Sequence, residues 1–412
     1  VPDPGGQGIE LHVATQWLHE DRRQIAACLD LPVDAVRLVL GGVGGAFGAR
    51  EDISLQVHTC LLALRLGRPV RIAYSRAESF LGHVHRHPAT IWMRHHATAE
   101  GEIVRIESRM VFDGGAYAST SSAVLINAVT HAQGPYRCAN AVVDGYAVRT
   151  NHLPCGAMRG FGVVQACFAH ESQMDKLALA CGVDPVEIRL RNAMRTGDAL
   201  ITGQPVLNVA PVERCIRDTA ALPLPDEPVG GRIDGQSGTD RVGDVMKLPG
   251  GAGLTAERSD IVRGIGWAVA IKNLMYSEGF DDYATARCRL ADGVAMLKFA
   301  TSEVGQGFVT IALQIARTIL GVDDVVLDRI DTQVGSAGST SASRQTWMSG
   351  GAVDAACRTV RERMFEHVGR VHGVDPIRLV VEGTDLVDSV SGWRITVAEA
   401  TAGAEFDETV EY

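Results

Sequence analysis

Three glycine-rich segments of this 412-residue chain have the residue types needed to bind an anionic ligand through the backbone. They are Gly41–Gly48, Ala157–Gly162 and Glu303–Gly307, and each stands at the start of an expected helix. Because glycine has no Cβ atom, several backbone N–H groups can crowd around a ligand at a helix N-terminus. Three such junctions could converge on one large anionic cofactor. A plain tight turn remains the alternative for each segment taken alone.

The first segment does not match the common nucleotide-binding motifs. The third glycine of a GxGxxG fingerprint is missing, and no Lys-Ser or Lys-Thr pair follows as in a P-loop. A fourth segment, residues 338–346, is dense in hydroxyl and amide groups, which is typical of a loop that binds phosphate or a polar heterocycle.

The elements that must position these segments follow from the apolar spacing. Alternation predicts strands at 36–40, 70–75, 90–98, 103–112, 142–149, 294–300 and 325–330. Apolar spacings of three and four residues, together with capping residues, predict six helices. One follows Gln16 and runs to about Leu29, and one begins at Asp184. The other four cover residues 51–66, 162–180, 308–320 and 351–368. The stretch at 222–260 is rich in Gly, Pro and Asp and indicates a flexible linker or loop between domains at 1–221 and 261–412.

Composition excludes several classes of protein. With 46% hydrophobic and 21% charged residues the chain is typical of a globular protein. A net charge of −10 opposes a phosphate backbone and argues against nucleic-acid binding. No apolar run approaches the roughly 20 residues that span a bilayer. Nine scattered cysteines without a CxxC pair favour reduced thiols in the cytoplasm over a disulfide scaffold, a zinc site or an iron–sulfur cluster.

Further motifs accompany the four segments along the chain. They are Thr15-Gln16, Gly44–Gly48 with Glu51, Arg86–Pro88, Asp113–Tyr117, Arg149–Asn151, Met158–Gly162, Glu303–Gly307 and Ser343–Gln345. In this order the set resembles the large, molybdenum-binding subunit of the xanthine dehydrogenase/aldehyde oxidase family, the molybdenum hydroxylases. The resemblance covers most of 9–221 and 261–360. It implies an α+β fold of two molybdopterin-binding domains with mixed sheets and helices, the second incomplete. It also implies a molybdenum–molybdopterin cofactor, in its mono- or cytosine dinucleotide form.

The resemblance also implies roles for individual residues. Gln16 would hydrogen-bond an oxo ligand of the metal, and Phe47 and Gly48 would place backbone beside it. Arg159 would offer its backbone N–H beside the metal as well. Gln306, with Gly305, would contact the pterin, and Ser343, Arg344 and Gln345 would cradle the pterin or its phosphate. Cofactor sulfurs hold the metal in this family, so no protein metal ligand is expected.

Four residues are implied on the substrate side. Glu51 stands where purine oxidisers keep a substrate-anchoring carboxylate, and Phe161 would lie against a flat substrate ring. Asn127 and Met158 stand where purine oxidisers carry an arginine and an aromatic residue. We therefore expect weak or no oxidation of xanthine.

The chain departs from the family pattern at both ends. The family's catalytic glutamate lies in a Gly-Glu-Pro-like turn near the far C-terminus, and no such turn occurs before Tyr412. The family's small N-terminal domain is also missing, and the chain begins at Val1 without an initiator Met. We expect a central portion of a longer subunit, not active alone and holding no cofactor when isolated.

The resemblance implies the activity and partners of the full-length protein. It would hydroxylate an N-heterocycle or aldehyde with water-derived oxygen and pass electrons to iron–sulfur and FAD subunits or domains, as an oligomer. A non-catalytic structural or assembly module without cofactor is the alternative.

Two other groups of polar residues have ordinary structural interpretations. His83, His85 and His87 alternate and could form a metal triad, but no acidic partner follows nearby, and a structural role is favoured. Glu171 and Asp175 lie four residues apart on an expected helix and could form an acid–base pair. A solvated helix face, paired with Lys176 or arginines, is the favoured interpretation.

Overall fold

The structure is a computed structural model that describes residues 1–2, 8–223, 265–274 and 282–412. The predicted linker at 222–260 lies outside the described residues except for its first two positions. The sheets are mixed or small and the helices pack on their faces, so the predicted α+β class is confirmed. Among the described residues, no helix combines the length and the apolar character needed to cross a membrane.

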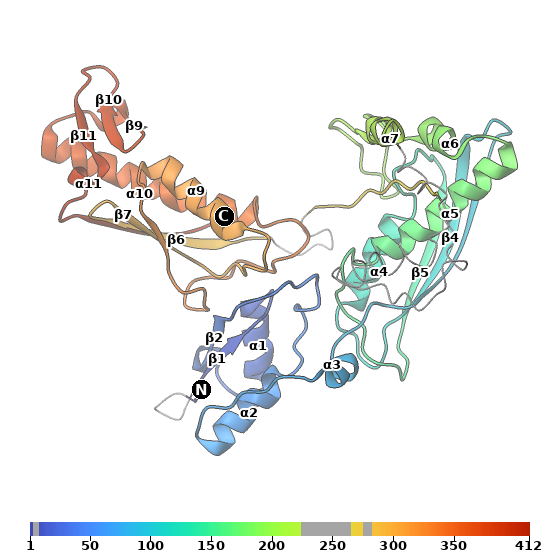
Figure 1. Ribbon diagram of the computed structural model, residues 1–412, viewed down its shortest axis with the longest axis horizontal. Coiled ribbons are helices and arrows are strands. Elements are labelled where there is room, and N and C mark those ends of the chain that lie inside the picture. Colours follow the sequence, from blue (N-terminus) through green and yellow to red (C-terminus); the bar gives the residue numbers. More distant parts are fainter. Residues whose placement is uncertain (3–7, 224–264, 275–281) are drawn as a thin grey trace, which may run out of the picture.

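The N-terminal unit is a two-stranded parallel sheet covered by helices (Figure 1, blue). Its elements are β1 (Ile9–Val13), α1 (Leu18–Leu29), η1 (Val33–Ala35), β2 (Val36–Leu40), α2 (Gln56–Leu66) and α3 (Arg76–Gly82). The glycine-rich segment at 41–48 follows β2 directly, as the strand prediction at 36–40 required.

The next unit is a three-stranded sheet with helices on one side (Figure 1, green and cyan). Its elements are β3 (Ala89–Ala97), β4 (Ile103–Asp113), α4 (Ser121–Thr130), β5 (Ala141–Val148), α5 (Val163–Cys181), α6 (Pro185–Asn192) and α7 (Val212–Ala220). Strands β3 and β4 pair antiparallel, and β4 and β5 pair parallel. Helix α5 begins at the glycine turn and ends at Gly182 with φ +64°, as predicted from the C-cap glycine.

The last unit is a four-stranded sheet in the order β12-β6-β7-β8, packed on two helices (Figure 1, orange). Its elements are β6 (Thr285–Ala291), β7 (Val294–Phe299), α9 (Phe308–Leu320), β8 (Val325–Leu327), α10 (Met348–His372) and β12 (Glu405–Glu411). A small sheet near its end holds η3 (Pro376–Arg378), β9 (Leu379–Glu382), β10 (Asp385–Asp388), β11 (Arg394–Thr396) and α11 (Val397–Ala400). The predicted apolar stripe of α10 is buried at each of its positions, Val353, Cys357, Val360, Met364 and Val368.

One hydrophobic core joins the N-terminal unit to this last sheet. Leu38 of β2 and Leu297 of β7 are both 0% exposed in the same cluster. The backbone continues the contact, since Leu40 N donates to Ile330 O at 2.9 Å. The N-terminal unit therefore packs with the last sheet, β12-β6-β7-β8, although the sequence prediction placed it in one domain with the rest of residues 1–221. The domain boundaries remain predictions.

The predicted strand at 70–75 is wrong. The exposure of Val70–Tyr74 alternates as in a strand, but these residues are not part of any sheet. Alternation reports which side chains face the core, whereas a strand also requires a neighbour that pairs with its backbone.

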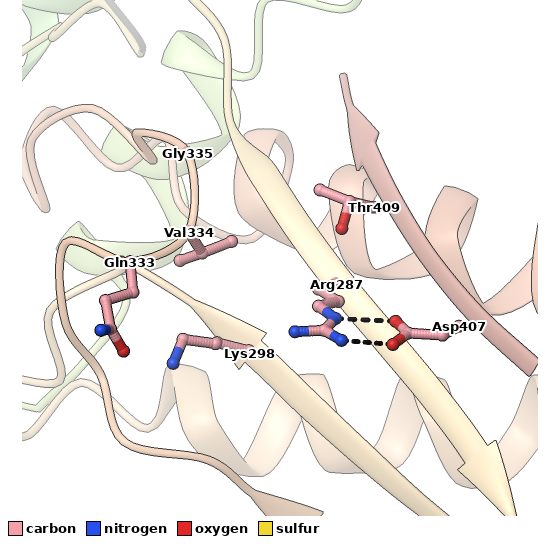
Figure 2. A pocket seen from close by; sticks show the side chains of 7 residues that line it. All are labelled: Arg287, Lys298, Gln333, Val334, Gly335, Asp407 and Thr409. Carbon is pink, nitrogen blue, oxygen red and sulfur yellow. Dashed lines mark hydrogen bonds and ion pairs between the residues drawn. The ribbon is translucent and has the colours of Figure 1, made fainter.

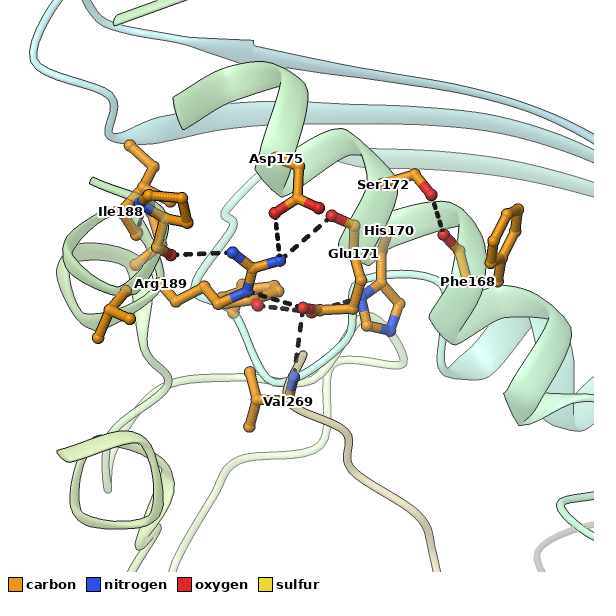
Figure 3. Close-up of polar contacts among 12 residues, drawn as sticks. Phe168, His170, Glu171, Ser172, Asp175, Ile188, Arg189 and Val269 are labelled. Atoms are coloured by element: carbon orange, nitrogen blue, oxygen red, sulfur yellow. Dashed lines mark hydrogen bonds and ion pairs between the residues drawn. The ribbon is translucent and has the colours of Figure 1, made fainter. Parts of the chain in front are cut away.

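A buried charge network ties α5 to α6, where the sequence predicted a solvated helix face (Figure 3). The Glu171 side chain is only 8% exposed, and its carboxylate accepts from Arg189 Nε at 2.8 Å and Tyr136 Oη at 2.5 Å. His170 Nδ1 lies 3.1 Å from it, and Val269 N donates to it at 3.2 Å. Burial alone would raise the pKa of Glu171, but hydrogen bonds from His170, Tyr136 and Arg189 outweigh it and lower the pKa. The prediction for Glu171 was wrong because Arg189, from another helix, covers it.

His95 on β3 makes the stability of this unit pH-dependent. Both ring nitrogens are buried without a hydrogen-bond partner in the part of the chain that the structure describes. Burial, with a smaller contribution from His170, lowers the pKa of His95 from 6.5 to about 4. Between pH 6.5 and about pH 4, His95 is therefore protonated in the unfolded chain but neutral in the folded chain. The contribution of neutral His95 to the free energy of unfolding is fully present above pH 6.5 and is lost as the pH falls toward 4.

We expect about 2 kcal/mol of unfolding free energy to be lost between pH 7.5 and pH 5 through this group. Chemical denaturation at several pH values measures the loss, and His95→Phe should flatten the slope. His96→Phe is the control, because His96 lies 3.5 Å from Glu107 and its side chain is 40% exposed. An unchanged slope in His95→Phe would contradict the assignment.

Candidate functional site

The side-chain amide of Gln16 joins two of the predicted segments. Gln16 is 3% exposed at the end of the loop after β1. Its Oε1 accepts from Gly48 N at 3.0 Å and Arg50 N at 3.3 Å, and its Nε2 donates to Thr340 O at 2.7 Å. One buried amide thus links the turn after β2 to the hydroxyl-rich segment at 338–346.

Thr340 extends this linkage to the third segment. Its hydroxyl accepts from Ser302 N at 3.1 Å and lies 3.0 Å from Ser302 O, to which it donates. Gln306 Nε2 donates to the same Ser302 carbonyl at 3.1 Å. A continuous series of hydrogen bonds therefore runs from Gly48 through Gln16 and Thr340 to Gln306.

The turn at 157–162 packs against Gly48, at one end of this series of hydrogen bonds. Gly48 has φ +91°, and a Cβ added to it would lie 3.1 Å from Met158 N. The Arg159 guanidinium lies 6.0 Å from the Phe47 ring centroid, and the Arg159 carbonyl accepts from Arg86 Nη2 at 2.6 Å. The structure therefore brings all four segments together at Gly48, Gln16 and Thr340.

Replacement of Gln16 by alanine should lower the free energy of unfolding by about 2 kcal/mol, because the buried Thr340 carbonyl and two turn N–H groups lose their partner. Thermal and chemical denaturation measure the change. Gln24→Ala is the matched control, since Gln24 on α1 donates to Glu20 of the same helix at 2.8 Å and links no separate segments within the described residues. Equal stability of the two variants would show that the amide does not hold the segments together.

Arg344 and Gln345 face the protein interior. Arg344 is 0% exposed, and its guanidinium pairs with Asp282 and donates to the carbonyl of Ala337 at 2.7 Å. Gln345 donates to Ser339 O at 2.9 Å. Neither side chain is turned outward, and the backbone N–H of Arg344 donates to Ser341 O at 3.2 Å.

Ser343 differs from its neighbours because it is exposed. Its φ of +53° is left-handed, which is uncommon for a residue with a Cβ atom. Its hydroxyl is accessible at the tip of the segment at 338–346.

Glu303 fills the N-terminus of α9, which the sequence suggested as an anion site. Its carboxylate accepts from Gly305 N at 2.9 Å, Gly307 N at 3.0 Å and Val309 N at 3.0 Å. Burial would raise the pKa of Glu303, but the backbone hydrogen bonds prevail and lower it. A phosphate could not occupy this helix end without displacing the carboxylate. The exposed loop backbone and the exposed Gln306 are what remain accessible.

The carboxylates of Glu51 and Asp52 accept hydrogen bonds from two different segments. Glu51 Oε1 accepts from Ser339 Oγ at 2.9 Å, and Asp52 accepts from the Ser119 hydroxyl. Burial raises the pKa of Asp52, and hydrogen bonds from Ser119 and the backbone of Ala157 offset part of the rise. Glu51 therefore has a protein partner within the site.

The remaining predicted residues lie in the unit that contains α4 and α5. Phe161, with φ +49°, is partly buried against the cluster that contains Val124 of α4. Asn127 on the same helix is 1% exposed, and its Oδ1 accepts from Lys272 Nζ at 3.1 Å. Met158 is half-buried beside Gly48.

Sequence reasoning missed the hydroxyl groups that connect the segments. Ser302 and Thr340 lie within or beside quoted motifs, and Asp52 follows Glu51 directly. Their residue types were visible, but a serine or threonine in a loop has too many possible partners for spacing alone to identify one.

The alternating histidines do not form a cluster. His83 Nε2 lies 3.3 Å from Arg50 Nη1, His85 Nε2 lies 2.8 Å from Phe80 O, and His87 Nε2 lies 2.8 Å from Ser121 Oγ. Within the described ranges, no three His, Cys, Asp or Glu side chains are placed to hold a metal ion. The structural interpretation of these histidines agrees with their separate partners.

A polar recess of about 420 Å³ lies on the open face of the last sheet (Figure 2). Arg287 is ion-paired with Asp407 there, and Lys298 lies 3.1 Å from Asp328. The charges that line it are neutralised within the protein. It is therefore a weaker candidate for an anion site than the junction at Gln16.

Comparison with known proteins identifies the family. Residues 1–193 and residues 252–412 each match a molybdopterin cofactor-binding domain. The chain belongs to the molybdenum hydroxylase family. The resemblance drawn from the motifs is confirmed, and both halves of the candidate site come from molybdopterin-binding domains.

Named relatives agree with this assignment, and a solved structure has the same fold. The chain is 32% identical over 352 residues to a probable xanthine dehydrogenase subunit of Bacillus subtilis, covering 84% of this chain and 44% of the relative. It is 43% identical over 196 residues to the nicotinate dehydrogenase large molybdopterin subunit of Eubacterium barkeri, covering 48% and 46%. The chain thus spans about half the length of these relatives. Quinoline 2-oxidoreductase from Pseudomonas putida 86 has the same fold, with a TM-score of 0.80 at 22% identity over 100% of this chain and 54% of its own.

Proposed function

We propose that the two domains hold a molybdenum–molybdopterin cofactor where the four segments meet. The observation that carries this proposal is the series of hydrogen bonds from Gly48 through Gln16, Thr340 and Ser302 to Gln306. It holds three turns, from both domains, in one place. The fourth turn, at 157–162, packs against Gly48.

The residues present fit such a group. Ser302 is 0% exposed, yet its Oγ has no hydrogen-bond partner within the described part of the chain. Gly305 and Gly307 have φ of +97° and +87°, and nothing lies within 4 Å of the position that a side chain would occupy. A buried donor and an unobstructed backbone are what a polar, flat cofactor needs.

Each residue at the junction has a distinct task in this proposal. Gln16 Nε2 donates one amide hydrogen to Thr340 O, and its second amide hydrogen would donate to the cofactor. The backbones of Phe47, Gly48, Arg159 and Gly305, with Gln306 and the segment Ser343, Arg344 and Gln345, would hold the cofactor. When bound, the cofactor supplies two-electron redox chemistry and a water-derived oxygen. Phe161, Met158, Glu51 and Asn127 would orient the substrate.

We infer that the whole protein hydroxylates an N-heterocycle or an aldehyde and passes electrons to iron–sulfur and FAD partners. The names of the relatives, which are subunits of xanthine and nicotinate dehydrogenases, support an N-heterocycle in particular. Asn127 in place of an arginine still argues against xanthine itself.

The decisive experiment is metal analysis with pterin fluorescence on protein produced together with its partner subunits. We expect about one molybdenum and one pterin per chain, and dye reduction dependent on an N-heterocycle or aldehyde. Folded protein without either cofactor component would contradict the proposal.

The alternative is a non-catalytic module without cofactor. One observation favours it: the polar groups of this turn are paired within the protein. The Glu303 carboxylate accepts from backbone N–H groups at the start of α9, and the Gln306 amide donates to Ser302 O and accepts from Val304 N. Absence of cofactor together with intact folding and intact partner association would support this alternative.

A further inference from the structure

A buried carboxyl adjoins the turn at 50–54, which carries two acidic residues of the candidate site. Asp21, in the first turn of α1, is 0% exposed. Its Oδ2 accepts from Gln56 Nε2 at 3.3 Å, whereas its Oδ1 has no hydrogen-bond partner in the part of the chain that the structure describes. A buried carboxylate needs several hydrogen bonds to offset the loss of water, so this group is poorly satisfied as an anion.

Two polar side chains connect Asp21 to this turn. Gln56, which is 6% exposed at the start of α2, donates to Asp21 and accepts from Ser54 N at 2.6 Å. Thr15, which is 0% exposed, is the other polar neighbour of the carboxyl, and its hydroxyl donates to Arg50 O at 3.2 Å. The two ends of the turn are therefore held by side chains that adjoin one carboxyl.

The position of the turn decides several contacts of the candidate site. Arg50 N donates to Gln16 Oε1 at 3.3 Å, and Glu51 Oε1 accepts from Ser339 Oγ at 2.9 Å. Asp52, next in the chain, accepts from the Ser119 hydroxyl. A shift of the turn would therefore move its contacts with Gln16 and with the segment at 338–346.

The hydroxyl of Thr15 has a single hydrogen, and the charge of Asp21 decides where that hydrogen is drawn. A hydroxyl oxygen can accept twice, and Thr15 Oγ1 accepts from Trp17 N at 3.1 Å. A neutral Asp21 carboxyl can donate its own hydrogen to that oxygen, so Thr15 keeps its hydrogen on Arg50 O. An Asp21 carboxylate is only an acceptor, and it competes with Arg50 O for the same hydrogen.

The surroundings of Asp21 favour its neutral form. Burial raises the pKa of Asp21 from 3.8 to about 7, hydrogen bonding by its two polar neighbours offsets part of the rise, and the negative charges of Glu20 and Asp52 add to it. Glu20 belongs to α1 itself and Asp52 to the turn. On α2, His58 is exposed, and burial raises the pKa of the Cys60 thiol to about 11, so this thiol is uncharged at neutral pH.

We propose that Asp21 is a positioning residue for the candidate site, because its buried carboxyl holds the turn that carries Glu51 and Asp52. The proposal rests on the proposed function and adds to it a control of the substrate side by pH. The neutral carboxyl holds the turn, and loss of the proton loosens it. Because the pKa is higher in the closed turn than in a hydrated one, this contribution is fully present below pH 3.8 and is lost as the pH rises through about 7.

Hydrogen exchange measured by mass spectrometry reads the turn directly, on the protein with its cofactor and partner subunits. Exchange at pH 5.5 is compared with exchange at pH 8 after correction for the intrinsic rates. In the wild-type protein we expect the protection factor of the peptide at 48–56 to fall at least roughly tenfold between these two values. The peptide that covers α10 (Met348–His372) is the internal control and should change by less than roughly twofold.

Three variants separate the charge of Asp21 from its shape. Asp21→Asn keeps the shape of a neutral carboxyl and cannot ionise, so it should retain the wild-type protection of pH 5.5 at both pH values. Asp21→Ala removes the acceptor of Gln56 and should have low protection at both. Asp34→Asn is the control and should follow the wild-type protein, because the Asp34 side chain is 98% exposed. A protection factor that does not change with pH in the wild-type protein would overturn the proposal, and so would an equal fall in Asp21→Asn.

Steady-state kinetics with benzaldehyde, which does not titrate in this range, test the link to the substrate side. The KM of the wild-type protein should equal that of Asp21→Asn at pH 5.5 and exceed it roughly threefold at pH 8, with similar kcat values. Equal KM values at pH 8 would overturn the control of the substrate side. If benzaldehyde is not turned over, hydrogen exchange still decides the role of Asp21, whereas missing cofactor contradicts the proposed function.

Discussion

Glu171→Ala is expected to lower the free energy of unfolding by about 3–5 kcal/mol. The substitution leaves the Arg189 guanidinium, whose side chain is 1% exposed, without its buried carboxylate. It also removes the acceptor of Tyr136 Oη and of the Val269 backbone N–H. Urea denaturation followed by circular dichroism measures the loss.

Asp175→Ala is the matched control for this prediction. Asp175 pairs with the same arginine at 2.8 Å, but its side chain is 57% exposed. Because water screens an exposed pair, we expect a loss below about 1 kcal/mol. Similar losses in the two variants would mean that the energy resides in the arginine's packing rather than in the buried charge pair.

Glu303→Ala is expected to have the second large effect, about 2–3 kcal/mol, because three backbone N–H groups at the start of α9 lose a charged acceptor. The consequence should extend beyond stability. Gly305 and Gly307 lie in left-handed backbone that this carboxylate holds in place. We therefore expect the molybdenum and pterin content of the purified protein to fall roughly tenfold, which corresponds to a loss of about 1.4 kcal/mol in binding free energy.

Glu303→Gln separates charge from shape in this experiment. An amide oxygen can accept one or two of the three hydrogen bonds, so an intermediate loss of stability and cofactor is expected. Glu362→Ala, at an exposed position of α10, should change neither quantity. Full cofactor content in Glu303→Ala would show that the loop does not need the carboxylate in order to bind.

Local patterns were sufficient to predict the elements that carry the site. The glycine segment after β2 and the helix that ends at Gly182 follow from residues near one another in the chain. Strand β7 and helices α9 and α10 were also predicted within a few residues of their ends. Capping, apolar periodicity and glycine conformations act over one or two turns, so a single sequence contains them.

The failures have one common cause, a partner that is distant in the sequence. The stretch at 70–75 has the strand pattern but lies outside every sheet, and Glu171 was assigned to solvent because Arg189 lies 18 residues away. The resemblance placed Arg344 around the pterin or its phosphate without indicating where its side chain would lie, and the structure directs the guanidinium inward to Asp282, 62 residues away. A residue type indicates what a side chain can bind and does not indicate which group the fold will bring to it.

The sequence by itself determined the family, the α+β elements and the four segments that could meet around a cofactor, because each depends on short motifs and local backbone preferences. Only the tertiary structure decided how those segments are joined. The bonds from Gln16 to Thr340, 324 residues apart, and from Lys272 to Asn127, 145 residues apart, exist because packing of the core places them together. Side-chain hydrogen bonds reach only about 3 Å, so their partners are known only once the fold has set the distance.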